Sequence, residues 1–186
     1  MLQEGHSKEV YAIDFQEDGA LACTGGLDAI GRVWDLRSGK SAMVLDGHVK
    51  DILSISFSPN GYQIATGSND DTIRIWDMRS LKAIYTIPAH KSAVSDVTFF
   101  KSHMPLPRAF ETSPTITDKP TMDVDVDLPV AGLFLVSGGY DGTIKIWSAD
   151  DWQLVRSMTS DPDGKVMSVD VSQGAFLLCL YNGKSR

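Results

Sequence analysis

The stretch Gly67-Ser-Asn-Asp-Asp-Thr-Ile-Arg-Ile-Trp-Asp77 decides the fold, because two other segments of the chain align with it without gaps. They are Gly25-Gly-Leu-Asp-Ala-Ile-Gly-Arg-Val-Trp-Asp35 and Gly138-Gly-Tyr-Asp-Gly-Thr-Ile-Lys-Ile-Trp-Ser148. Each segment has an Asp six residues before its Trp and a Ser or Thr ten residues before it. The chain is therefore built from repeats, and their period is the first property to establish.

The period is set by histidines that precede each segment. His6, His48 and His90 are 42 residues apart, within the range of about 40–45 residues for a WD-type propeller blade. In the second unit, alternating apolar residues and an Asn60-Gly61 turn predict strands over 52–57, 63–67, 72–76 and 83–87. No segment of useful length has helical periodicity. The sequence predicts an all-β chain, a WD-repeat β-propeller fragment with three four-stranded blades and the first hairpin of a fourth.

The repeat also divides the chain into units. We expect blades over 5–46, 47–88 and 89–160, an incomplete blade over 161–180 and a tail over 181–186. The third blade carries a proline-rich, acidic insertion at 102–131, between strands expected at 94–100 and 133–138, which is typical of a flexible surface loop. In the incomplete blade, 164–172 and 175–180 match the first two strands, but Ser160-Asp161 replaces the Gly-His pair.

The repeated polar residues predict a buried hydrogen-bond chain in every blade. A buried Trp indole needs an acceptor, which a Ser or Thr hydroxyl provides. That hydroxyl donates to a His nitrogen, and the other His nitrogen donates to an Asp that turn amides also satisfy. Because the set recurs three times, we interpret it as scaffold and not as a hydrolase triad. Its predicted members are His6, Thr24, Asp28 and Trp34; His48, Thr66, Asp70 and Trp76; and His90, Ser137, Asp141 and Trp147.

Other candidate chemistry fails on spacing. A calcium loop starting at Asp123 would need Gly and Glu where the chain has Leu128 and Phe134. The histidines and cysteines lack zinc-site spacing, and no nucleophile elbow occurs. The Gly-Lys-Ser of the tail lacks the first Gly of a phosphate-binding loop, because Leu178 stands there. We therefore predict no enzyme activity, no metal and no cofactor.

Composition and the two cysteines bear on the compartment. The net charge of −7 argues against a generic phosphate-binding face, which needs surplus Lys and Arg. Cys23 and Cys179 lie in apolar strands and are expected to be buried free thiols. The amino terminus has no signal-peptide pattern, and no apolar run approaches the ~20 residues of a membrane span. The cytoplasm or the nucleus is the expected location.

More specific wording lies in residues 25–37, 57–68, 85–90 and 164–167, among them the Gly-Leu-Asp-Ala turn followed by Gly31. Together these segments resemble the WD-repeat subunit of the spliceosomal small nuclear ribonucleoprotein that carries the paired U-four and U-six RNAs. The resemblance covers nearly all of residues 5–172 apart from the insertion. The insertion itself departs from that family's pattern, and the fourth blade lacks the turn Asp and the Trp.

The resemblance has several implications. It implies a seven-bladed propeller in the complete protein, a nuclear location and a role in pre-mRNA splicing. It also implies a place in the tri-snRNP beside a cyclophilin and another pre-mRNA-processing factor, with any small nuclear RNA association indirect. The alternative is a generic WD-repeat adaptor in another complex, in ubiquitin ligation or signalling. Direct RNA contact through Lys and Arg on one rim is a third, weaker alternative.

Partner contacts are expected on the face where the Gly-His loops and the Asp turns emerge. Tyr140 is the strongest candidate, as an exposed aromatic at a loop tip. Arg32, Arg74 and Lys145 share the Trp face of their strands, so we expect their stems between blades and their charges in water. The candidate contact positions are Lys8, Leu27, Lys50, Asn69, Lys91 and Tyr140.

The end of the chain suggests two further expectations. The Gly-Lys-Ser of the tail is what in-frame translation across a donor splice site beginning GTAAGT would produce, so we hypothesise that Gly183 to Arg186 is intron-encoded. The apolar strand at 175–180 is an unprotected edge, and incomplete blades leave open faces. The isolated chain is therefore expected to be poorly soluble or to oligomerise.

Overall fold

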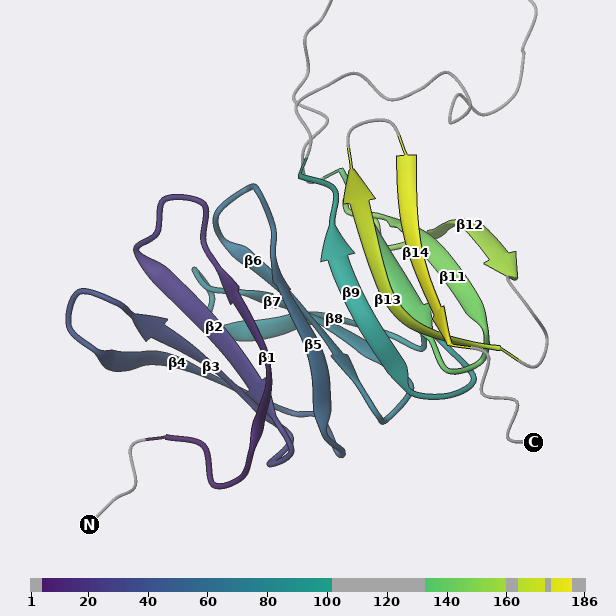
Figure 1. The fold of residues 1–186 in the computed structure, drawn as a ribbon. Helices are drawn as coiled ribbons and strands as arrows, with labels where there is room; N and C mark the ends of the chain where they lie inside the picture. The colour runs from purple at the N-terminus through teal and green to yellow at the C-terminus, as the bar shows by residue number, and fades with distance from the viewer. Residues whose placement is uncertain (1–4, 102–132, 160–163, 173–174, 182–186) are drawn as a thin grey trace, which may run out of the picture.

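The computed structural model describes residues 5–101, 133–159, 164–172 and 175–181, with side chains described only as far as Val171. All regular secondary structure in this part of the chain is β-strand (Figure 1), as the sequence predicts. The expected insertion at 102–131, the Ser160-Asp161 pair and residues 182–186 of the tail lie outside the described residues.

Three of the four sheets are antiparallel meanders of four strands in chain order. The first sheet consists of β1 (Val10–Phe15), β2 (Leu21–Gly26), β3 (Ile30–Asp35) and β4 (Lys40–Asp46). The second consists of β5 (Ile52–Phe57), β6 (Gln63–Ser68), β7 (Ile73–Asp77) and β8 (Lys82–Ile87). The third consists of β9 (Val94–Phe99), β10 (Phe134–Gly139), β11 (Thr143–Ser148) and β12 (Leu154–Thr159).

The fourth sheet is a hairpin of β13 (Lys165–Ser172) and β14 (Ala175–Tyr181). The strands agree with the expected ones to within one residue at most ends. Within the described residues β14 pairs with β13 alone, so its other edge is unpaired.

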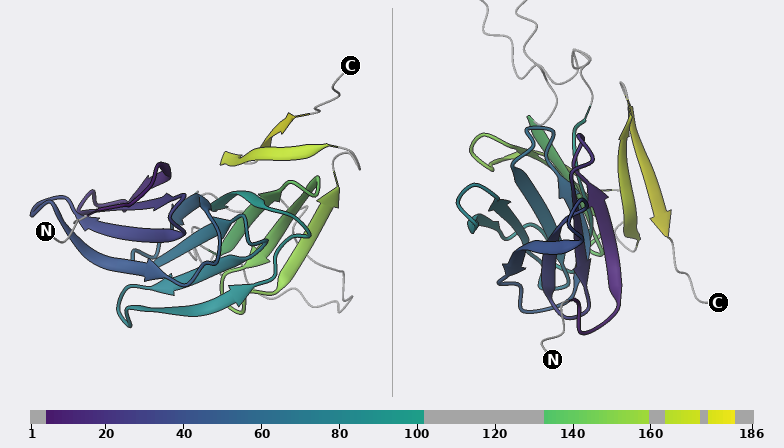
Figure 2. Two further views of the ribbon diagram at one scale, coloured as in Figure 1. Left: turned by 90° about the horizontal axis from the view of Figure 1, so that it is seen from below. Right: turned by 90° about the vertical axis from the view of Figure 1, so that its left-hand side faces the viewer.

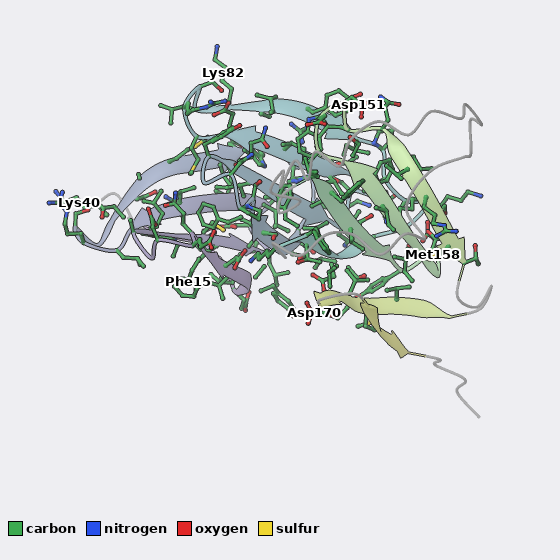
Figure 3. The ribbon with its side chains drawn as sticks, turned by 90° about the horizontal axis from the view of Figure 1, so that it is seen from above. Phe15, Lys40, Lys82, Asp151, Met158 and Asp170 are labelled. Carbon is green, nitrogen blue, oxygen red and sulfur yellow. The ribbon has the colours of Figure 1, made fainter. Side chains whose placement is uncertain are left out.

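The sheets are stacked like the blades of a fan, with β1, β5, β9 and β13 adjacent along the inner side (Figures 1 and 2). The strands β4, β8 and β12 form the outer edge. In the view with side chains, Phe15 and Asp170 of inner strands lie on the side opposite Lys82 and Asp151 (Figure 3). This is the arrangement of neighbouring propeller blades.

The core is divided into layers, one between each pair of sheets. Alternation in the strands directs apolar side chains to both faces of each sheet, because successive side chains point to opposite sides. The layers are Val33, Leu45 and Cys23 with Ile55 and Phe57; Ala65, Ile73 and Ile75 with Val97, Phe99 and Leu135; and Val136, Ile144 and Ile146 with Val166 and Val169.

Glycine in the second strand of each of the first three sheets permits this close stacking. A β-carbon on Gly67 would lie 2.9 Å from Cγ1 of Val94, and one on Gly138 would lie 2.6 Å from Cγ1 of Val166. Ile52 and Val94 begin β5 and β9, and Val166 is the second residue of β13; each is thus seated where the preceding sheet has no side chain. The sequence repeats these glycines because the packing distance between sheets repeats.

The first sheet has one face without a neighbour among the described residues. Val10, Ile13 and Phe15 of β1 are about half exposed, at 48%, 59% and 51%. The equivalent residues of β5 are Ile52, Ile55 and Phe57, which are at most 5% exposed against the first sheet. The open apolar face that the sequence predicts is therefore present on β1.

Candidate functional site

The repeated polar residues come from four places in each sheet. The His lies in the loop before the first strand, the Ser or Thr lies in the second strand, and the Trp lies in the third strand. The Asp lies in the turn between the second and third strands. A register that places the hydroxyl residue beside the third strand brings all four together, as the pairing of Thr66 with Arg74 shows.

In the second sheet the four side chains form a continuous chain of hydrogen bonds. The Trp76 indole N–H donates to Oγ1 of Thr66 at 2.9 Å, and Nε2 of His48 lies 2.7 Å from the same oxygen. Nδ1 of His48 lies 2.8 Å from the Asp70 carboxylate. The amides of Val49 and Thr72 also donate to Asp70, at 3.2 and 3.1 Å.

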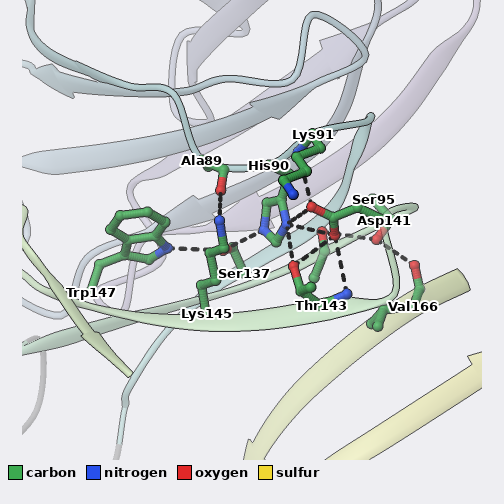
Figure 4. A network of polar contacts seen from close by, with 11 residues as sticks. Ala89, His90, Lys91, Ser95, Ser137, Asp141, Thr143, Lys145, Trp147 and Val166 are labelled. Carbon is green, nitrogen blue, oxygen red and sulfur yellow. Dashed lines mark hydrogen bonds and ion pairs between the residues drawn. The ribbon is translucent and has the colours of Figure 1, made fainter. Parts of the chain in front are cut away.

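The first and third sheets repeat this geometry. Trp34 donates to Thr24 at 2.8 Å, and Nε2 of His6 lies 2.8 Å from that hydroxyl, with Nδ1 3.0 Å from Asp28. In the third sheet Trp147 donates to Ser137 at 2.9 Å. The ring nitrogens of His90 lie 2.9 Å from Ser137 and 3.0 Å from Asp141 (Figure 4). The structure thus brings together all twelve residues of the predicted sets, four to a sheet.

Burial and hydrogen bonding act in opposite directions on the pKa values of these groups. Burial lowers the pKa of His48 and of His90, although Asp70 and Asp141 oppose that effect. Burial alone would raise the pKa of Asp70, but hydrogen bonds from Thr72 and His48 outweigh it and lower that pKa to about 2. The imidazoles of His48 and His90 are therefore neutral and the Asp70 carboxylate is ionised near pH 7.

This arrangement braces each sheet, and in the second and third sheets it buries the hydroxyl of the set. Ser137 and Thr66 are fully buried, and each hydroxyl already has an indole and an imidazole as partners. A nucleophile must be accessible to its substrate as well as adjacent to a base. One set repeated three times, largely buried in the second and third sheets and half-buried in the first, is the mark of a structural element.

Metal-ligating, membrane-spanning and thiol groups are the other features of interest in the described residues. No group of three or more His, Cys, Asp or Glu side chains there is arranged to hold a metal ion. In that same part of the chain no helix is both long and apolar enough to cross a membrane. Cys23 is a buried free thiol, and burial raises its pKa well above the usual range. The side chain of Cys179 lies outside the described residues.

The predicted contact positions lie at one end of the sheets, in the loops that hold the His and Asp residues. Lys8, Lys50 and Lys91 are exposed there. Leu27 and Asn69 are half-buried, and their amides bond the loop carbonyls of Glu9 and Asp51. The lysines are thus the positions with the most freedom to meet a partner.

Tyr140 differs from its prediction as an exposed aromatic. It is half-buried, and the ammonium of Lys165 lies 5.1 Å from the centroid of its ring. The fourth sheet causes this difference, because β13 brings Lys165 over the turn between β10 and β11. Tyr140 therefore presents only part of its ring to the solvent.

One cationic residue lies two positions before each Trp, and the surroundings of these three side chains also differ from the expected ones. The Lys145 ammonium does not simply reach water, because it donates to the carbonyl oxygen of Ala89 and lies 5.8 Å from the Trp147 ring centroid (Figure 4). Arg32 and Arg74 are half-buried, and the Nε atom of each is buried with no hydrogen-bond partner among the described residues. Their contact with water is therefore smaller than expected, and their structural role stays a prediction.

Some structural residues were missed by sequence reasoning. The Thr72 and Thr143 hydroxyls donate to Asp70 and Asp141 at 2.6 and 2.7 Å, which adds a fifth member to two of the sets. Their signal was available, because each Thr lies two residues after its Asp. The Ser95 hydroxyl donates to the carbonyl of Val166 at 2.7 Å, and only the packing of β13 on the third sheet reveals that contact.

Comparison with known proteins identifies the family to which this repeat corresponds. A family model described as WD domain, G-beta repeat, matches residues 1–35, 39–77 and 115–148. A guanine nucleotide-binding protein subunit beta-like protein of Encephalitozoon cuniculi (strain GB-M1) is 45% identical over 40 residues, which are 22% of this chain and 12% of that protein.

Two solved structures show the same fold, the WD40 repeats of RRP9 and the protein U3-55K. Each superposes with a TM-score of 0.69 at 20% sequence identity, over 89% of this chain and 43% of the other. The chain therefore spans less than half the length of the solved structures that it resembles.

Proposed function

We propose that this chain, which belongs to the WD domain, G-beta repeat family, is a protein-binding scaffold of a small nuclear ribonucleoprotein in nuclear pre-mRNA splicing. The observation that carries the scaffold role is the burial of the His, Ser or Thr, Asp and Trp sets, which hold the loops rigidly and keep no reactive group. Rigid loops on a β-scaffold are suited to recognition, because little conformational entropy is lost on binding.

The splicing role rests on the sequence segments 25–37, 57–68, 85–90 and 164–167, which resemble the WD-repeat subunit of the U-four/U-six particle. The partners proposed on that basis are a cyclophilin and another pre-mRNA-processing factor of the tri-snRNP. The net charge of −7 favours protein partners over direct RNA contact, so association with small nuclear RNA is proposed to be indirect. The proposed location is the nucleus.

The exposed lysines at the loop end, Lys8, Lys50 and Lys91, are the proposed contact positions, with Leu27, Asn69 and the partly buried Tyr140 beside them. Each lysine lies one or two residues after the His of its sheet, so the buried set fixes its backbone. The Lys91 amide, for example, donates to Asp141 at 2.9 Å.

Affinity purification of the tagged chain from nuclear extract tests this proposal. We expect recovery of spliceosomal proteins with the U-four and U-six RNAs, and loss of both in a variant that combines Lys50→Glu and Lys91→Glu. The matched control is Lys40→Glu, an exposed lysine at the other end of its sheet. Equal recovery by the two variants would remove the contact positions, and an absence of spliceosomal components with the unaltered chain would contradict the splicing role.

A second candidate function is a WD-repeat adaptor in ubiquitin ligation or signalling. The 40-residue likeness to a guanine nucleotide-binding protein subunit beta-like protein is the observation that favours it. Recovery of cullins or kinases in the same purification would support this candidate. Direct RNA contact would instead show as binding that weakens steeply with added salt.

A further inference from the structure

At the end of the second sheet opposite the His loops, the side chain of Arg79 is held in place by its neighbours. The turns that join β5 to β6 and β7 to β8 lie together there, and the Met78 amide donates to the carbonyl of Tyr62 at 2.9 Å. The guanidinium carbon of Arg79 lies 3.7 Å from the centroid of the Tyr62 ring. The guanidinium therefore lies over the face of an aromatic ring, a favourable position for Arg.

A carboxylate holds the same guanidinium from its edge. Nε and Nη2 of Arg79 donate to the two oxygens of Asp77, at 3.1 and 2.8 Å. The Arg79 side chain is nevertheless 65% exposed, whereas Asp77 is 12% exposed. One edge and one face of the guanidinium are thus occupied, and the opposite face is presented to the solvent in a fixed orientation.

The same turn exposes a strained apolar residue. Leu81 has a φ of 55°, in the left-handed region that is unfavourable for a residue with a β-carbon, and it is 64% exposed. The equivalent residue of the third sheet, Trp152, has the same conformation, but it is buried against Phe99. Burial offsets the strain at Trp152, and no comparable burial offsets it at Leu81.

The first sheet shows what this turn looks like without those features. Its turn contains Arg37 and, at the left-handed position, Gly39. The Arg37 amide donates to Asp35 at 2.9 Å, as the Arg79 amide donates to Asp77 at 2.8 Å. The residue that corresponds to Tyr62 is Ala20, whose carbonyl accepts from the Leu36 amide. The first sheet thus lacks both the aromatic ring of Tyr62 and the exposed Leu81, so these two features are not part of the repeat.

We propose that Tyr62, Arg79 and Leu81 form a second protein-binding site, which takes an aromatic side chain and an adjacent aliphatic side chain from a partner protein. The aromatic ring stacks on the open face of the Arg79 guanidinium, and the aliphatic side chain contacts Leu81. Tyr and Arg are the residue types enriched at the centres of interfaces. This site lies at the opposite end of the sheet from the lysines proposed above, so it does not depend on them.

A nucleobase would also stack on a guanidinium, but the surroundings favour a protein. Asp77 neutralises Arg79 and repels a phosphate, the chain has a net charge of −7, and Leu81 offers no group that bonds a nucleotide. An exposed apolar side chain next to a stacked cation suits the mixed character of a protein interface.

The test uses the full chain, captured sparsely on a biosensor so that it cannot self-associate. The probe is a blocked Ser-Leu-Trp-Ser peptide, and the reference probe has Ala in place of Trp. We expect Arg79→Ala, Arg79→Lys and Tyr62→Ala each to weaken Trp-peptide binding by about 3- to 30-fold, because each variant loses either the planar guanidinium or the ring on which it stacks. Tyr62→Phe keeps the ring and retains binding, and Arg37→Ala in the first sheet is the matched control.

Leu81→Gly separates recognition from structure. A residue kept for folding would lower the thermal midpoint when replaced, whereas removal of strain at Leu81 should leave the midpoint unchanged or higher while peptide binding weakens. Equal binding of the Trp and Ala peptides, unaltered binding by Arg79→Ala, or a uridine oligonucleotide bound at Arg79 in place of the peptide would overturn the proposal. None of these outcomes bears on the recovery of spliceosomal components, so the two proposals fail independently.

Discussion

The Ser54 hydroxyl in β5 donates a hydrogen bond to Oδ1 of Asp96 in β9, at 2.7 Å. These residues belong to different sheets, so the bond joins neighbouring inner strands that share no backbone pairing. The other oxygen of Asp96 accepts from the Ser168 hydroxyl at 2.7 Å and from the Val169 amide at 2.9 Å, both in β13. One carboxylate therefore ties three sheets together.

Asp96→Ala should loosen the fourth sheet before the others. The change leaves the Val169 amide and two hydroxyls without their acceptor, so we expect the free energy of unfolding to fall by about 1–3 kcal/mol. Hydrogen exchange at the Val169 amide should quicken more than at amides of β6. The control is Asp170→Ala, because Asp170 is exposed and accepts from the amide of its own neighbour Val171. Equal effects of both variants would contradict the bridging role.

The buried sets should depend on every polar member. In Thr66→Val the side chain keeps its shape, but the Trp76 indole and the His48 ring lose their common partner. We expect a loss of about 2–4 kcal/mol, since two buried polar groups are left unsatisfied. Urea denaturation followed by Trp fluorescence measures the loss. Thr86→Val, at an exposed position of β8, should change the midpoint little.

Stability should fall in acid in two stages. The pKa values of His48 and His90 are lowered from 6.5 by burial, so the unfolded chain binds these protons more readily than the folded one. Their contribution is complete above about pH 6.5 and is lost as the pH falls below it. Asp70 and Asp141 have pKa values of about 2 against an ordinary 3.8, so a second loss follows between pH 3.8 and 2. Urea midpoints measured from pH 7.5 to 2.5 check both stages, and a midpoint that rises on acidification would contradict them.

The glycines that face the neighbouring sheet should not tolerate a methyl group. In Gly67→Ala the new β-carbon lies 2.9 Å from Cγ1 of Val94, so the second and third sheets must move apart. We expect a destabilisation of about 1–3 kcal/mol from overpacking. The double variant Gly67→Ala with Val94→Ala removes the nearest colliding methyl group and leaves Cγ1 of Val97 at 3.1 Å, so it should recover part of this loss. If the two substitutions simply add, the clash is not the cause.

Self-association should depend on the open face of the first sheet. Val10 and Ile13 are exposed on β1, and apolar faces of this kind promote association. Val10→Lys with Ile13→Lys should shift the chain toward monomer in light scattering after size exclusion. The control is Ile84→Lys, which alters an exposed apolar residue on the outer strand β8. A cooperative monomer without any substitution would contradict the expectation.

Much of the fold followed from spacing. The 42-residue interval and the repeated positions of His, Ser or Thr, Asp and Trp predict strands, sheet order and all twelve members of the buried sets. This is possible because a repeated structure needs the same packing and the same hydrogen bonds at every repeat. The same residue types therefore recur at the same positions several times in one chain.

Contacts between sheets could not be predicted from the repeat. They join residues with no fixed interval and depend on how far each sheet is rotated against the next. The half-burial of Tyr140 under Lys165 and the bond from Lys145 to Ala89 arise from such neighbours. The stacking of Arg79 on Tyr62 joins two turns within one sheet and is equally invisible in a periodic pattern. The period of the repeat can be read from the sequence alone. The environment of a surface side chain, in contrast, forms only when distant segments pack together.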